Sequence, residues 1–289
     1  MASIIPPVTK LSSRIIRILG CNPGRMTLQG TNTYVIGTGK RRILIDAGDS
    51  DVPQYIQNLK TVVSDENIDL EHIIVTHWHH DHIGGVKDVV KNVSNCNVWK
   101  LPRSEQDNSD EPLPDNIQVK YLKPGDEFKT EGATLRIVHT PGHTTDHIIL
   151  WLEEEKAIFS GDCILGEGTA VFEDLHDYMA SLQNILKLNP NILYPGHGPV
   201  VSDPMPKIEY YIHHRNNREK QILDVLQREP NRKFTEMDIV KIIYTDTPED
   251  LHLAAAVNVG HHLQKLLKDK KVISTGTKWQ WITNPSSSL

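Results

Sequence analysis

The ten residues THWHHDHIGG, at positions 76–85, contain four histidines and one aspartate within six consecutive positions. An imidazole ring is half polar and needs a partner wherever it is buried, so packing alone rarely explains histidines at this density. The segment HIIVTH, at 72–77, is apolar and β-branched, which predicts a buried strand that runs directly into the histidines. The stretch therefore indicates a strand followed by a ligand-binding loop.

The spacing His-x-His-x-Asp-His places imidazoles and a carboxylate within a short loop, and such donors suit Zn²⁺ or another first-row metal. Four ligands this close in sequence do not converge easily on one ion. We therefore expect two ions side by side, with His77 and His79 facing one ion and Asp81 and His82 facing the other. His80 occupies a variable position of the spacing, and we expect that it does not bind metal.

Each ion needs further ligands from elsewhere in the chain. Three glycine-flanked residues are candidates: His143 in TPGHT, Asp162 in FSGD and His197 in YPGHG. Apolar segments with the character of strands precede them, so the repeated pattern is a strand that ends in a histidine or aspartate beside glycine. The three cysteines have no CxxC spacing, and any metal must therefore be held by histidine and carboxylate.

These motifs, in this order and together with Asp46 in LIDAG, resemble the metallo-β-lactamase superfamily over roughly residues 12–200. The resemblance implies an α/β fold, an αββα sandwich with the metals at one edge. It also implies that Asp46 braces the site by supporting a metal-bound histidine. The implied ligands are His77, His79 and His143 for the first zinc, Asp81, His82 and His197 for the second, and Asp162 as a bridge between the two.

Two zinc ions at such a site lower the pKa of a shared water and stabilise negative charge on the attacked centre. The expected reaction is hydrolysis, with Asp81 and His82 as the candidate catalytic residues. The metals do not select among a phosphodiester, a thioester, a lactone and an amide. Mn²⁺ or Fe²⁺ in place of Zn²⁺ also remains open.

A domain boundary is expected near the sequence SDPMP, which divides the chain into a hydrolase domain, residues 1–204, and a C-terminal domain, residues 205–289. The apolar periodicity predicts helices over 207–227, 234–244 and 250–271. Thr235 and Asp238 have the spacing of a capping box at the start of the second helix. The segment 272–282 reads as a β-hairpin, so the C-terminal domain is expected to be a winged-helix-like α+β module.

Charge differs between the two parts of the chain. From Met205 onward there are 13 Lys and Arg against 10 Asp and Glu, whereas residues 1–204 have 18 against 27. A basic module beside a two-metal hydrolase suggests a nucleic-acid substrate, with His214, Arg215 and Arg218 as candidate RNA contacts. Two alternatives remain: these side chains form only a solvated helix face, or the helices wall a small-molecule pocket, as in glyoxalase II-type thioesterases.

A closer resemblance is carried by GCNPG, MTLQGTNTY, SGDCILGEGT, VFEDL and the helix HRNNREKQIL. These segments are similar to the β-lactamase-like protein 2 family of animals, within the glyoxalase II-like group. The resemblance implies an endoribonuclease of the mitochondrial matrix that cuts single-stranded RNA. We expect a metal-activated hydroxide to attack the phosphorus and to leave 5′-phosphate and 3′-hydroxyl ends. There is no long exosite arm of the kind that tRNA 3′-processing enzymes have, which argues against tRNA end maturation.

Three functions therefore stand: a zinc endoribonuclease acting in mitochondrial RNA turnover, a small-molecule thioesterase or lactonase, and an RNA-binding scaffold. No run of about 18 apolar residues is present, so no membrane span is expected. The chain has no acidic residue before Asp46, which fits organelle targeting, but RIIRILG at 14–20 also fits a basic first strand. The oligomeric state, monomer or dimer, stays open.

Overall fold

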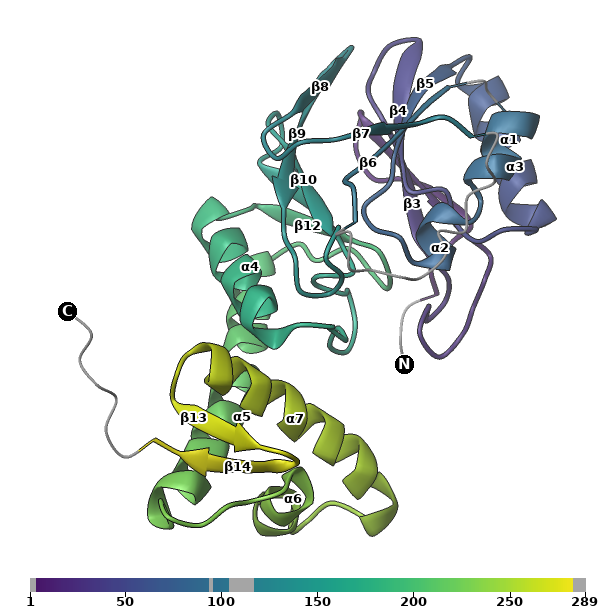
Figure 1. The fold of residues 1–289 in the computed structure, drawn as a ribbon. Helices are drawn as coiled ribbons and strands as arrows, with labels where there is room; N and C mark the ends of the chain where they lie inside the picture. Colours follow the sequence, from purple (N-terminus) through teal and green to yellow (C-terminus); the bar gives the residue numbers. More distant parts are fainter. Residues whose placement is uncertain (1–3, 94–95, 104–116, 283–289) are drawn as a thin grey trace.

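The computed structural model describes residues 4–93, 96–103 and 117–282. Two β-sheets form the centre of the larger domain (Figure 1). The first sheet has seven strands in sequence order: β1 Val8–Lys10, β2 Ile15–Leu19, β3 Asn32–Ile36, β4 Arg41–Ile45, β5 Asp69–Ile74, β6 Asn97–Lys100 and β7 Val119–Tyr121. The second has the order β12-β11-β10-β9-β8: β8 Glu127–Thr130, β9 Ala133–His139, β10 Ile148–Leu152, β11 Ala157–Gly161 and β12 Ile192–Pro195.

The inner strands are buried on both faces, because alternate side chains of each strand enter different apolar layers. Ile15 and Tyr34 belong to the layer between the two sheets, whereas their neighbours Ile16 and Val35 belong to the layer beneath the first pair of helices. That pair is α1 Pro53–Asp65 and α3 Val86–Asn92, and α4 Leu175–Leu188 covers the second sheet. The predicted αββα sandwich is confirmed.

The C-terminal domain contains α6 Glu236–Ile243, α7 His252–Lys268 and the hairpin β13 Val272–Thr275 with β14 Lys278–Trp281; the 3₁₀ turn η1 Glu249–Leu251 precedes α7. Thr235 and Asp238 form the predicted capping box, since each side chain accepts a hydrogen bond from the other's backbone N–H. The hairpin packs with the helices in one apolar cluster. The predicted winged-helix-like module is therefore confirmed.

The long helix α5, Pro204–Arg228, belongs to both domains. Its first half places Ile208 and Ile212 in the apolar layer under the second sheet. Its second half places Ile222 and Leu226 in the core of the C-terminal domain. One continuous helix thus crosses from the hydrolase core into the winged-helix core, and it sets how the C-terminal domain lies against the edge of the sandwich.

Three further sequence predictions meet the structure here. The segment RIIRILG forms the buried strand β2. The sequence RSEQDNSDEPLPDN, at 103–116, is polar, acidic and interrupted by Pro, which predicts a surface loop; apart from Arg103 it lies outside the described residues. Within the part of the chain that is described, no helix combines the length and the apolar character that crossing a membrane requires.

Candidate metal centre

Seven predicted ligands lie together at one edge of the two sheets, because each follows the end of a strand. His77, His79, Asp81 and His82 come after β5, and the other three come after β9, β11 and β12. Their donor atoms form two groups, within each of which all donors lie within 4.8 Å of one another. The first group is His77, His79, His143 and Asp162, and the second is Asp81, His82 and His197.

The histidine loop is compact because a single helical turn, α2 His80–Ile83, follows His79. The glycines after it allow the loop to approach the end of β4 closely. A Cβ atom on Gly85 would lie 2.1 Å from the backbone oxygen of Ala47, a distance that no side chain tolerates. Gly85 is thus required for the loop to pack beside Asp46, whose own backbone is left-handed, with φ of 58°.

The first group of donors has unpaired imidazole lone pairs that face one another. His77 directs Nδ1 to the Thr76 hydroxyl at 3.0 Å, and His143 directs Nδ1 to the Val171 carbonyl oxygen at 2.8 Å. When these Nδ1 atoms donate, both Nε2 atoms are bare acceptors, yet they lie 3.3 Å apart. Nδ1 of His79 lies 3.0 and 3.1 Å from them.

A cation at the centre of this triangle resolves the repulsion. Tetrahedral zinc with Zn–N bonds of about 2.0–2.1 Å separates its nitrogen ligands by about 3.3–3.4 Å. The observed 3.0–3.3 Å separations are close to that spacing. The residues present therefore fit a zinc-sized ion.

The second group combines two histidines with a carboxylate. Nε2 of His82 lies 3.3 Å from Asp81 Oδ2 and 3.4 Å from Nε2 of His197. Asp162 reaches both groups, since its oxygens lie 3.4 Å from His82, 3.2 Å from His197 and 3.8 Å from His143. Its Oδ1 atom is buried and accepts no hydrogen bond from the described residues. A buried carboxylate within reach of both groups of donors suits a bridge between two cations.

Electrostatics differ between the two groups. Burial lowers the pKa of His77 and His143, and it lowers the pKa of His79 to about 4. Burial also opposes protonation of His82 and His197, but the nearby carboxylates outweigh it. Asp81 and Asp162 raise the pKa of His82 well above its usual range, and Asp162 raises that of His197 to about 9. Without metal, the histidines of the first group are neutral at pH 7 and those of the second group are protonated.

Zinc binding to the metal-free protein at pH 7 is therefore expected to release protons from His82 and His197 and none from the first group. As the pH falls below about 9, protons compete increasingly for the histidines of the second group, whereas His79 of the first group stays neutral until about pH 4. Acidification should thus remove the ion of the second group first. Calorimetric zinc titrations in buffers of different ionisation enthalpy measure the release, and proton-free binding of both ions would contradict the expectation.

Asp46 supports the second group from below. It is 2% exposed and accepts hydrogen bonds from the Thr76 backbone N–H at 2.7 Å and the Thr76 hydroxyl at 2.9 Å. Its Oδ2 also lies 2.8 Å from Nδ1 of His82. This contact orients the ring of His82 so that Nε2 points toward the other donors, which is the support that a metal-bound histidine needs.

Three supporting groups were not among the predicted site residues. The Thr31 hydroxyl donates to Asp81 Oδ2 at 2.8 Å, and His147 accepts a hydrogen bond from the Asp162 backbone N–H at 3.1 Å. The third is the Val171 carbonyl, the partner of His143. Thr31 lies within the MTLQGTNTY segment, which was the available signal, whereas nothing in sequence marks a backbone carbonyl.

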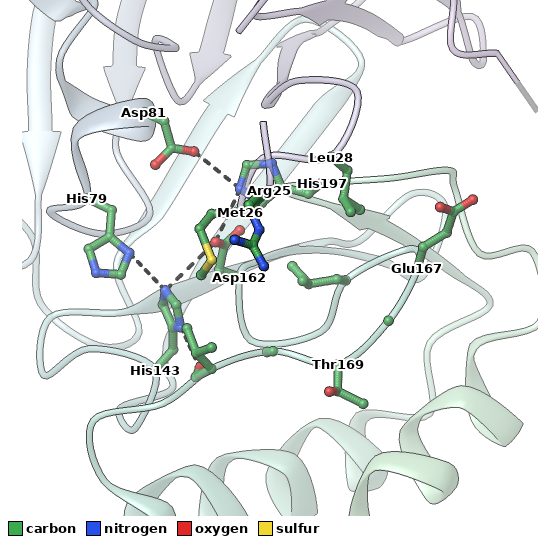
Figure 2. A pocket seen from close by; sticks show the side chains of 14 residues that line it. Arg25, Met26, Leu28, His79, Asp81, His143, Asp162, Glu167, Thr169 and His197 are labelled. Atoms are coloured by element: carbon green, nitrogen blue, oxygen red, sulfur yellow. Dashed lines mark hydrogen bonds and ion pairs between the residues drawn. The ribbon is translucent and has the colours of Figure 1, made fainter. Parts of the chain in front are cut away.

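A cavity of about 300 Å³ opens above the donors (Figure 2). Its floor includes His79, Asp81, His143, Asp162 and His197, while His77 and His82 are fully buried beneath. Its walls come from two loops, and they include Arg25, Met26, Leu28, Leu165, Glu167 and the segment Gly168–Val171. The exposed Arg25 places a cation at the mouth, above a site that is otherwise rich in carboxylates.

The predicted RNA contacts lie on α5, and they differ in exposure. His214 is exposed. Arg215 is only 6% exposed; it donates to the Ala170 carbonyl at 3.2 Å, and its guanidinium lies 4.7 Å from the ring centre of Phe172. Arg218 is half-buried, with its guanidinium 3.9 Å from the ring centre of Tyr244. Arg215 is thus part of the packing between the domains and not of a solvated helix face.

His80 lies outside both groups of donors. Its side chain is 57% exposed, and its Nδ1 lies 2.5 Å from Asp49 Oδ1. We expect His80→Ala to leave the metal content of the protein nearly unchanged, because the ring contributes no donor to either group. Metal analysis of the purified variant tests this, and the loss of a full equivalent of metal would show that the assignment of ligands is wrong.

Comparisons with known proteins agree with this geometry. Residues 26–197 match the family model described as the metallo-beta-lactamase superfamily, and residues 235–279 match that of the beta-lactamase associated winged helix domain. A Drosophila melanogaster protein named beta-lactamase-like protein 2 homolog is 52% identical over 99% of this chain and 100% of its own length. A Caenorhabditis elegans protein of the same name is 45% identical over 98% of this chain and 94% of its own length.

Solved structures show the same fold at low identity. A beta-lactamase domain protein from Burkholderia ambifaria superimposes with a TM-score of 0.78 at 16% identity, over 95% of this chain and 93% of its own. A metallo-beta-lactamase family protein from Thermus thermophilus gives a TM-score of 0.71 at 18% identity, over 94% of this chain and all of its own. The shared architecture therefore includes the C-terminal domain.

Proposed function

This chain belongs to the metallo-β-lactamase superfamily, and on that premise we propose that it is a two-zinc endoribonuclease that cleaves single-stranded RNA. The family and the clustered His and Asp donors make it a metal-dependent hydrolase. We further propose what the substrate is, which ions are bound and how many, and a role in mitochondrial RNA turnover. The role in mitochondrial RNA turnover is proposed from the resemblance to β-lactamase-like protein 2.

The observation that carries the proposal is the placement of cations around a metal centre open to solvent. Arg25 lies at the mouth of the cavity, Arg215 binds the Ala170 carbonyl of the cavity wall, and Arg218 lies further along α5 against the ring of Tyr244. Neither of these two helix guanidiniums forms a salt bridge with a carboxylate of the described residues; Arg215 bonds a carbonyl and both lie over aromatic rings. Unneutralised arginines beside a hydrolytic site favour a polyanionic substrate.

When bound, two divalent ions lower the pKa of a water at the site and stabilise negative charge on the attacked phosphorus. The protein's own residues position the reaction. Arg25 is placed to donate to a non-bridging phosphate oxygen at the mouth. Asp81 is held by Thr31 on one side and lines the cavity floor. Burial raises the pKa of Asp81, but His82 and His197 lower it by more. This carboxylate therefore stays ionised and can accept a hydrogen bond from water.

Incubation of the purified protein with end-labelled single-stranded RNA, with and without chelator, tests the proposal. We expect metal-dependent internal cleavage that leaves 5′-phosphate and 3′-hydroxyl ends. Asp81→Ala, prepared in parallel, should be inactive, because it removes a donor of the second group. Equal cleavage by the two proteins would point to a contaminating nuclease and reject the proposal. Metal analysis of the same preparations identifies the ion.

One observation favours a second function, a small-molecule thioesterase or lactonase of the glyoxalase II type. The cavity wall includes the apolar side chains of Leu28, Leu165 and Val171, which suit an acyl group. Efficient turnover of a panel of acyl thioesters and lactones, together with no cleavage of RNA, would establish this alternative in place of the endoribonuclease.

A further inference from the structure

A second cavity of about 330 Å³ lies between the segment Thr169–Phe172 and the helices α5 and α7. It shares Thr169, Ala170 and Val171 with the cavity above the metal donors. Figure 2 shows the chain around Thr169 passing between the metal ligands and the neighbouring helices. The two cavities are therefore neighbours, with one short segment as their common wall. The remaining lining residues are His214, Arg215, Ala254, Val257, Asn258 and His261.

The common wall is held from both sides. On the metal side, Nδ1 of His143 lies 2.8 Å from the Val171 carbonyl oxygen. On the other side, Arg215 donates to the Ala170 carbonyl at 3.2 Å. The next residue, Phe172, stacks on Tyr178 with ring centres 5.2 Å apart. A rigid wall of this kind fixes the separation between the metal centre and the second cavity, as a substrate that occupies both requires.

The charge of the second cavity suits an anion. Its described lining residues include the Arg215 guanidinium and no carboxylate. Arg215 is almost fully buried and forms no salt bridge within the described part of the chain, so a phosphate nearby would gain a charge-assisted hydrogen bond and offset the cost of burying that cation. Burial lowers the pKa of both His214 and His261, which leaves neutral imidazole faces at neutral pH.

The rim of the same cavity exposes apolar and aromatic surface. Val171 is 52% exposed and Val257 is 63% exposed, although both are aliphatic. The ring of Tyr210, 54% exposed, lies 5.9 Å from that of His214, and the ring of His261 lies 5.2 Å from that of Phe172. Flat apolar contacts beside a cation are the combination by which proteins bind single-stranded nucleic acid, with bases on side chains and phosphates on Arg or Lys.

We propose that this second cavity is a nucleotide subsite: it binds one nucleotide of the RNA strand adjacent to the scissile phosphate, with the phosphate toward Arg215 and the base against Val257 and the ring of His261. The inference rests on the proposed endoribonuclease function and adds to it. The RNA strand would cross the wall Thr169–Val171 as it passes from the metal centre to the second cavity. RNA would then be bound on both sides of the scissile phosphate.

Val257 and Leu253 on α7 provide a matched pair of variants. They lie one helical turn apart, both are exposed aliphatic residues, and only Val257 lines the second cavity. In an Asp81→Ala background, which keeps the strand intact, fluorescence anisotropy with a labelled single-stranded oligoribonucleotide measures affinity. We expect Val257→Glu to weaken binding about tenfold or more, by blocking a base and repelling a phosphate. Leu253→Glu should stay within about twofold, because exposed charges are screened by salt.

Lysine in place of glutamate at the same two positions provides a second measurement. At low salt, Val257→Lys should tighten RNA binding more than Leu253→Lys does, because only the former places its charge beside the subsite. Equal effects of Glu at the two positions, or no effect at either, would overturn the subsite. Thermal melting of each variant confirms that it is folded, which is expected because both positions are exposed.

Cleavage assays separate this inference from the proposed function. If the Asp81→Ala protein binds RNA through the subsite but the unsubstituted protein never cleaves it, the endoribonuclease proposal fails and the subsite stands. If the unsubstituted protein cleaves RNA and Val257→Glu changes neither affinity nor KM, the subsite is wrong and the function stands. If Val257→Glu instead raises KM for an acyl thioester while RNA does not bind, the cavity holds an acyl substrate and the subsite is rejected.

Discussion

Replacing Asp162 by alanine is expected to lower kcat/KM for any hydrolysed substrate by about 10³-fold or more, the upper end of what the loss of one preorganised electrostatic group costs. Asp162 is the carboxylate that reaches both groups of donors, with oxygens 3.4 Å from His82 and 3.8 Å from His143. Its loss would leave three imidazoles for a first cation, and Asp81 with two imidazoles for a second, without the carboxylate between the two groups. We therefore also expect the metal content to fall by about one equivalent.

Asp177→Ala is the matched control for Asp162→Ala. Asp177 belongs to a third group of potential donors, with Asp174 and His176, at the start of α4. That group already has partners: Asp174 caps the helix by accepting from the Asp177 N–H, and it forms an ion pair with Lys268. We expect the metal content of Asp177→Ala to stay unchanged. Elemental analysis of both variants decides, and full metal and activity in Asp162→Ala would contradict the bridging role.

Much of the candidate site could be predicted from the sequence because its donors obey a local rule. Each follows a strand, His143, Asp162 and His197 also lie beside glycine, and strand ends meet at one edge of a sheet. The histidine loop supplies four of the seven donors within six residues, so their proximity needs no knowledge of the fold. Helix boundaries in the C-terminal domain were predictable for a similar reason, since the Thr235 capping box is a short-range interaction.

Contacts between distant segments were not predictable. The second cavity exists because α7 packs near the Thr169–Phe172 segment, which lies about eighty residues earlier in the chain. The apolar periodicity of neither segment predicts this contact. The burial of Arg215 had a signal, since Ile208, Tyr211, Ile212 and Arg215 follow the i, i+3, i+4, i+7 spacing of one helix face. A charged residue at that position nevertheless predicts a solvent-exposed edge of the helix. The sequence does not show that the Ala170 carbonyl and the Phe172 ring cover Arg215.

Asp46→Ala is expected to have the largest effect on stability, lowering the free energy of unfolding by about 3–5 kcal/mol, the cost of removing one partner of a buried ionic contact. Asp46 is 2% exposed and accepts hydrogen bonds from the backbone and hydroxyl of Thr76. It also contacts Nδ1 of His82 at 2.8 Å. Alanine leaves these buried donors unpaired. The same change should weaken zinc binding about 10- to 100-fold, because His82 loses its orientation.

Asp49→Ala serves as the control, because Asp49 follows in the same loop but its side chain is 33% exposed. Among the described residues, its polar contacts are with the exposed ring of His80 and the backbone N–H of Ser50. We expect it to change stability by no more than about 0.5 kcal/mol. Urea unfolding of the zinc-loaded and chelator-treated forms of each variant measures both effects. Similar losses in Asp46→Ala and Asp49→Ala would show that Asp46 has no special supporting role.

The pH dependence of the Asp46→Ala defect in the metal-free protein tests its physical cause. Against the effect of burial, Asp81, Asp162 and Asp46 together raise the pKa of His82 well above its usual range. A histidine whose pKa is raised on folding stabilises the protein fully below its unfolded pKa of about 6.5, and this stabilisation is lost as the pH rises through the folded pKa. The part of this stabilisation that comes from the contact between Asp46 and His82 is lost in Asp46→Ala. The difference in unfolding free energy should therefore be larger at pH 6 than in alkaline solution, and a difference independent of pH would mean that the hydrogen bonds to Thr76, and not the contact with His82, account for the loss.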